Sequence, residues 1–112
     1  MKNIFEEIRI ERQKQDEKWG VQNHPCLDLK LMQRSPDRMC EEYEIPTENR
    51  AKQLCEIAFE KQRPTFAHIA AEEFSEVVSA FDIHKRRAEL IQLTSVCVAW
   101  IEKIDRELNT KN

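Results

Sequence analysis

The C-terminal half of the chain carries four oxygen-bearing side chains at helical spacing: Glu73, Glu76, Glu89 and Gln92. Glu73 and Glu76 are three residues apart, which makes them neighbours on the surface of a helix. Two like charges held this close repel each other, and a divalent cation between them relieves the repulsion. Carboxylate and amide oxygens suit Mg²⁺ or Mn²⁺ better than zinc. The spacing therefore predicts a metal site.

Glu73 lies within a segment whose apolar periodicity predicts a helix from Thr65 to about Phe81. The apolar face of this helix is formed by Phe66, Ala70, Phe74, Val77 and Phe81. Glu73 falls on that face, where a carboxylate is costly unless it is paired or bound to a metal. Nothing basic in the core of this helix or of the next is placed to neutralise it. The position of Glu73 therefore favours a bound cation.

The second half of the site is expected on a helix from about Lys85 to Leu108. Glu89 opens the uncharged stretch of this helix, and Gln92 follows one turn later on the same side. A short connection makes the two helices an antiparallel hairpin, across which the acidic pair can face Glu89 and Gln92. An alternative stays open, because pairs of the type E-x-x-E are also common on solvated helix faces.

The rest of the sequence predicts an all-α fold. The expected helices cover residues 3–18, 47–62, 65–81 and 85–108. Asn3, Thr47 and Thr65 are suitable caps for the first three. Residues 20–46 are punctuated by prolines and predict a loop or lid, with a short helical turn starting at Ser35-Pro36. We therefore expect one domain over residues 1–112, an antiparallel bundle of about four helices.

Composition limits the classes of function. Charged residues make up 35% of the chain and hydrophobic residues 40%, which is typical of a folded protein. A net charge of −3 argues against stable nucleic-acid binding, but a metal ion can still help to bind a phosphorylated ligand. We expect no membrane span, since residues 90–101 are the longest uncharged run in the C-terminal half. Their near-continuous apolar surface predicts completion of the bundle by a homodimer or a tetramer.

The cysteines indicate a reducing compartment. Cys26, Cys40, Cys55 and Cys97 lack both C-x-x-C spacing and the spacing of a zinc finger. Cys55 and Cys97 lie in apolar helical patterns, where a free thiol behaves as a small hydrophobe. The charged N-terminal residues do not have the pattern of a signal peptide. Together these features predict reduced cysteines in a cytoplasmic protein.

The motif EEFSE at residues 72–76, followed by ELIQ at residues 89–92, resembles the signature of the MazG-like all-α nucleoside triphosphate pyrophosphohydrolases. That signature is E-x-x-E, a variable spacer and then E-x-x-D. Residues 11–25 and 42–56 also look like the short single-domain bacterial and phage members, as do the flanks of the two motifs. The resemblance covers most of the chain.

The resemblance implies cleavage of a nucleoside triphosphate (NTP or dNTP) to the monophosphate and pyrophosphate, as house-cleaning of the nucleotide pool. It also implies Mg²⁺ held by acidic residues of two helices, and assembly as dimers or tetramers. By position, Glu73 and Glu76 match the first acidic pair and Glu89 matches the third acid. Gln92 stands where the signature has Asp. This departure leaves a site with fewer charges, a different fourth ligand such as Glu72, or a member with reduced activity.

Roles for the remaining residues follow from this activity. Glu73 or Glu76 can orient or deprotonate the attacking water. The candidates for contact with the polyphosphate are Lys18, Lys85, Arg86 and Arg87. Trp19 can stack on a base and His24 can hydrogen-bond one, although Trp19 can instead be a packing residue that closes the first helix. Ordinary solvated charge is the alternative for each basic residue.

Two further hypotheses compete with catalysis. One is a non-catalytic helical module of the same fold that binds a nucleotide or a protein partner, and the Gln92 departure favours it. The other is a purely structural dimerising bundle in which the glutamates are solvated. Release of pyrophosphate distinguishes the enzyme from both.

Overall fold

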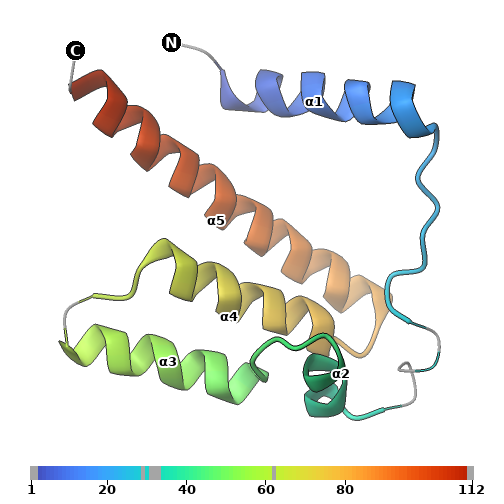
Figure 1. The fold of residues 1–112 in the computed structure, drawn as a ribbon, viewed down its shortest axis with the longest axis vertical. Helices are drawn as coiled ribbons and strands as arrows, with labels where there is room; N and C mark the ends of the chain where they lie inside the picture. Colours follow the sequence, from blue (N-terminus) through green and yellow to red (C-terminus); the bar gives the residue numbers. More distant parts are fainter. Residues whose placement is uncertain (1–2, 29, 31–33, 62, 111–112) are drawn as a thin grey trace.

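The computed structural model describes residues 3–28, 30, 34–61 and 63–110, and in this part of the chain it holds helices and no strand. The helices are α1 (Ile4–Trp19), α2 (Pro36–Glu42), α3 (Glu48–Lys61), α4 (Phe66–Ser79) and α5 (Ile83–Thr110) (Figure 1). The all-α prediction is confirmed. Helix α2 is the short turn expected at Ser35-Pro36 within the predicted loop, where positions 29 and 31–33 lie outside the described residues.

Local capping signals explain where the helices begin. The Asn3 side chain accepts a hydrogen bond from the backbone N–H of Phe5 at 2.9 Å, and Thr47 Oγ1 accepts one from the N–H of Arg50 at 3.2 Å. Thr65 and His68 form a reciprocal capping box at the start of α4. These are the three caps expected from the sequence. Each satisfies backbone donors that would otherwise lack a partner at a helix N-terminus.

Helix α4 is the centre of the packed part of the molecule. It contacts α5, α3 and α2, and Figure 1 shows it lying between α3 and α5. A small core forms where α2 meets the C-terminal end of α4, from Leu27, Met39, Cys40 and Val78, with Ile45 packed against it. This core holds α4 from the side opposite α5, so the helix that carries Glu73 and Glu76 is fixed on two sides.

The buried face of α4 differs in part from the expected one. Phe81 lies beyond the end of the helix and is 88% exposed, and Phe74 is also exposed. Small residues take their place: Ser75 and Ser79 are buried, and Cys40 Sγ lies 3.3 Å from Ser79 Oγ. The prediction that aromatic residues form the buried face was wrong here. Helix α2 approaches α4 closely, and only small side chains fit between them.

A buried arginine joins the end of α4 to the start of α5. Arg86 is 8% exposed, and its Nε donates to the carbonyl of Val77 at 3.1 Å. Its Nη2 donates to the carbonyl of Ala80. Asp82 caps α5, since its Oδ1 accepts a hydrogen bond from the N–H of Lys85 at 2.8 Å. Arg86 therefore satisfies carbonyls at the C-terminal end of α4 and sets the hairpin.

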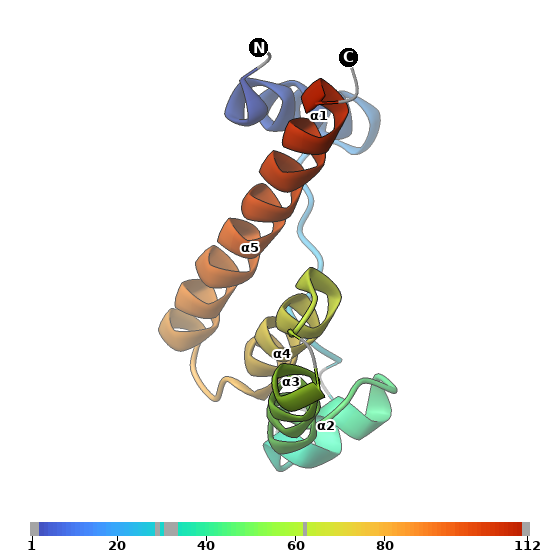
Figure 2. The same ribbon diagram turned by 90° about the vertical axis from the view of Figure 1, so that its left-hand side faces the viewer.

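Helix α1 lies outside the core around α4, and its first turn lies beside the end of α5, where Ile4 and Glu7 line a pocket together with Glu102 and Leu108. After α1 the chain continues as an extended segment over residues 20–28, as Figures 1 and 2 show, and none of the residues of α1 is buried. The radius of gyration is 16.6 Å, against about 13 Å for a compact domain of this size. The described residues thus show an all-α chain, and the antiparallel bundle completed by oligomerisation stays a prediction. Among them, no helix combines the length and the apolar character that a membrane crossing requires.

Replacing Arg86 by Met should destabilise the protein by about 2–4 kcal/mol. The change removes two charge-assisted hydrogen bonds and leaves buried carbonyls without donors. The matched control is the neighbouring Arg87→Met, whose exposed side chain should contribute no more than about 0.5 kcal/mol. Urea denaturation followed by circular dichroism measures both. Equal midpoints for the two variants would show that the Arg86 contacts do not set the hairpin.

Candidate metal centre

The α4–α5 hairpin brings three carboxylates to one place. Glu73 and Glu76 lie one turn apart on α4, and Glu89 comes from the second turn of α5. Each offers one oxygen, and these three oxygens all lie within 4.8 Å of one another. We call this group the carboxylate cluster. The helical spacing and the predicted hairpin are the geometric reasons for it, and the sequence suggested both.

Two oxygens of the cluster lack a hydrogen-bond partner among the described residues. They are Glu73 Oε2 and Glu89 Oε2, both buried. Glu89 is 3% exposed, so its carboxylate is almost fully removed from solvent. A buried carboxylate oxygen without a donor is costly, and a hard divalent cation is a partner that removes the cost. The donor set and the two free oxygens therefore fit Mg²⁺ or Mn²⁺.

Lys85 pairs with one member of the cluster. Its Nζ lies 2.7 Å from Glu89 Oε1, one helical turn away on α5. This corrects the expectation that nothing basic is placed to neutralise the glutamates. The signal was present in the sequence, because Lys and Glu four residues apart on a helix commonly pair. The Lys85 side chain is 55% exposed, so the pair lies at the border between the cluster and solvent.

The three carboxyl groups differ in their affinity for protons. Burial raises the pKa of Glu76 to about 8, helped by the hydrogen bond to Glu89 and by the charge of Glu73. Burial is also the main cause of the raised pKa of Glu73. The hydrogen bond from Lys85 lowers the pKa of Glu89. Without a metal, the cluster therefore holds a proton near neutral pH, and a cation must displace it to bind.

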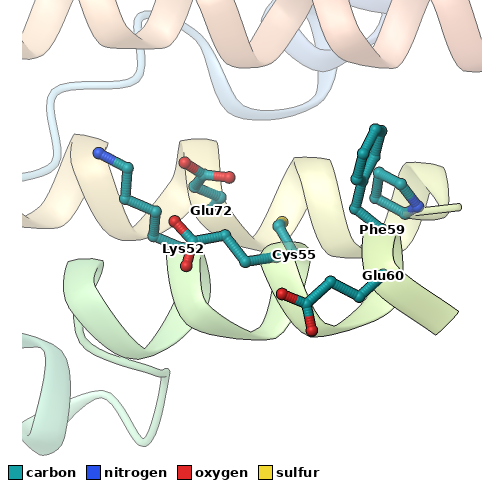
Figure 3. Close-up of a pocket in the computed structure, with 7 residues that line it drawn as sticks. Lys52, Cys55, Phe59, Glu60 and Glu72 are labelled. Carbon is teal, nitrogen blue, oxygen red and sulfur yellow. The ribbon is translucent and has the colours of Figure 1, made fainter.

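The two other predicted metal ligands lie differently. Glu72 is outside the carboxylate cluster and lines an open groove of about 430 Å³ between α3 and α4, together with Lys52, Cys55 and Phe59 (Figure 3). There burial and the Glu72 carboxylate raise the pKa of the Cys55 thiol to about 11. Gln92 follows Glu89 by one turn, and its side chain is exposed. Glu73, Glu76 and Glu89 are thus the members that the hairpin brings together.

The predicted substrate-binding residues fall into two groups. Trp19 and His24 line one shallow pocket of about 440 Å³ after α1, and the Lys18 ammonium lies 4.9 Å from the Trp19 ring centroid. Trp19 is 60% exposed, so it does not close α1 by packing. Lys85 is at the carboxylate cluster. The expectation for Arg86 is corrected, because its buried guanidinium already donates hydrogen bonds to the carbonyls of Val77 and Ala80 at the end of α4.

Comparison with known proteins gives no match: no protein-family model, no curated protein and no solved structure is significantly similar to this chain. The resemblance to the MazG-like family therefore rests on the quoted motifs alone.

In the presence of EDTA, Glu76→Gln should stabilise the protein at alkaline pH. The pKa of Glu76 is raised above its ordinary value of 4.5 to about 8 in the folded state. In the natural chain the free energy of unfolding therefore falls as pH rises from about 4.5 through 8, because the folded chain then loses a proton that the unfolded chain has already released. The glutamine side chain of the variant does not titrate, so the variant avoids this loss. Glu76 is partly exposed, so solvent screening limits the gain to about 1 kcal/mol, or roughly 5 °C.

Melting temperatures at about pH 6 and about pH 9, on either side of this pKa, test the prediction. The difference in melting temperature between Glu76→Gln and the natural chain should be larger at the higher pH than at the lower pH. Glu102→Gln, an exposed substitution on α5, is the control and should show no such growth. An advantage of equal size at both pH values would mean that Glu76 does not hold the proton.

Proposed function

We propose that this chain is a Mg²⁺-dependent nucleoside triphosphate pyrophosphohydrolase, which converts an NTP or dNTP to the monophosphate and pyrophosphate. The observation that supports it is the carboxylate cluster, with its two buried oxygens that lack a partner. The E-x-x-E pair on α4 and the single acid on α5 follow the order of the family signature. Such an enzyme would clear unwanted nucleotides from the cytoplasmic pool.

The residues of the carboxylate cluster would bind the metal ion and position the attacking water. Bound Mg²⁺ would offset the negative charge that develops on the phosphate oxygens. Glu73 or Glu76 would orient the attacking water and accept its proton. As the water oxygen bonds to the α-phosphorus, the bond to the leaving pyrophosphate breaks. The pKa of Glu76, raised to about 8, suits a group that must take up a proton near neutral pH, and burial shifts the pKa of Glu73 in the same direction.

A second candidate function is a non-catalytic module that binds a nucleotide. The exposed, neutral Gln92 supports it, since this position carries an acid in the family signature. An amide is a weaker ligand for Mg²⁺ than a carboxylate, so the cluster can hold a cation and still be a poor catalyst. The two candidates share the metal site and differ in turnover.

Pyrophosphate release from a panel of NTPs and dNTPs distinguishes the two candidates. We expect release with Mg²⁺ and none with EDTA, and a loss of about a hundredfold or more in Glu73→Gln and Glu89→Gln, because each removes a charged ligand. Glu102→Gln should keep full activity, since Glu102 is an exposed residue away from the cluster on α5. Nucleotide binding without pyrophosphate release would instead support the non-catalytic module.

We also propose that the chain assembles with itself. On α5 the buried residues are only Arg86 and Glu89 among those described, although the helix has 28 residues. Large apolar side chains stay exposed along its C-terminal half, including Trp100, Ile101, Ile104 and Leu108. Helix α1 presents exposed Phe5, Ile8 and Ile10. A second copy of the chain would cover these faces and complete the bundle, as a dimer or a tetramer.

Sedimentation tests the assembly. At micromolar concentration the natural chain should have at least twice the monomer mass of 13.4 kDa. Ile104→Glu places a charge on the exposed α5 face and should shift the protein towards monomer. Ile57→Glu is the matched control, because Ile57 is exposed to a similar degree on α3. A stable monomer of the natural chain would contradict the proposal.

A further inference from the structure

We propose that Lys85 determines which cations the carboxylate cluster accepts, by leaving the cluster with the charge that balances one divalent ion. The inference depends on the metal site proposed above and extends it to a specificity-determining residue. It comes from the Lys85–Glu89 pair and from the two cluster oxygens without partners.

The two oxygens of the Glu89 carboxylate differ in their surroundings. Its Oε1 is held by Lys85 Nζ at 2.7 Å, whereas its Oε2 is buried and has no hydrogen-bond partner among the described residues. Lys85 thus fixes the orientation of the carboxylate and leaves one oxygen free to bind a cation. A partner that orients a metal ligand in this way commonly tunes its affinity.

The charge count follows from this arrangement. The carboxylates of Glu73, Glu76 and Glu89 bring three negative charges to a bound cation, and Lys85 supplies one positive charge in contact with Glu89. The net charge of the group is then that of two carboxylates, which one divalent ion balances. Glu48 also acts on Lys85, but its side chain is exposed and its charge is screened.

Removal of the Lys85 charge should therefore favour ions of higher charge. A trivalent ion gains more than a divalent ion when a neighbouring positive charge is removed, because the repulsion scales with the charge of the ion. Tb³⁺ prefers oxygen ligands as Mn²⁺ does, so the two ions probe charge at one donor set. In Lys85→Met, the preference for Tb³⁺ over Mn²⁺ should rise by roughly tenfold, equivalent to about 1.4 kcal/mol.

The experiment is a calorimetric titration of the full chain with Mn²⁺ alone and with Tb³⁺ alone. Lys103→Met is the matched control, since Lys103 also pairs with a Glu four residues later on α5, on an exposed face. Lys103→Met should leave the preference for Tb³⁺ over Mn²⁺ unchanged. Lys85→Arg keeps the positive charge and should show the same preference as the natural chain. Lys85→Gln provides a second uncharged variant if Lys85→Met does not fold, as judged by circular dichroism.

The outcomes separate this inference from the proposed function. If the natural chain binds Mn²⁺ and the preference is the same in the uncharged Lys85 variants, Lys85 does not set the specificity, and the metal site stands. If the natural chain binds neither ion, the metal site itself is refuted and this inference falls with it. A rise in the Tb³⁺ preference of the Lys85 variants alone supports the inference.

Discussion

The contact between Arg86 and the C-terminal carbonyls of α4 fixes the geometry on which the rest of the packed structure depends. A helix ends with carbonyls that have no intrahelical donor, and here a side chain of the next helix supplies the donors. The direction of α5 is set as a result, and Glu89 follows Arg86 by three residues on the same helix. The approach of Glu89 to Glu73 and Glu76 is therefore a consequence of how the chain satisfies its own backbone.

The carboxylate cluster is an unfavourable feature that the fold maintains. Two buried carboxylate oxygens lack partners among the described residues, and a raised pKa for two of the three acids records the same cost. A polar group that destabilises the fold in this way is typical of a binding site, where the ligand removes the penalty. Packing elsewhere offsets it, since α2 and its core around Cys40 and Val78 hold α4 from the other side.

Local signals were sufficient for part of this structure. The caps Asn3, Thr47 and Thr65, and the periodicity of the apolar residues, placed the helices within about two residues, because both act over one or two turns. The convergence of the three glutamates followed from their helical spacing together with the short connection that predicts a hairpin. Packing between distant segments was not predictable in this way. Phe81 was assigned to a buried face and is exposed, because α4 ends at Ser79 and the chain turns to an extended conformation at Ala80. Arg86 and Arg87 are alike in sequence, and only the position of α4 distinguishes the buried one.

The same hairpin gives the two ends of α5 different roles. Its first turns hold the buried residues Arg86 and Glu89 and pack against α4, which also contacts α3 and α2. Its later turns carry apolar side chains that stay exposed. Among them, Trp100 stacks on Phe66 of α4, with 5.8 Å between the two ring centroids. A second copy of the chain packed against these later turns would stabilise α5 as a whole, because a helix folds cooperatively along its length. Since Glu89 is fixed by that helix, assembly at one end would also restrict the position of the cluster at the other. Association of the chain and order at the carboxylates would then be linked through a single element.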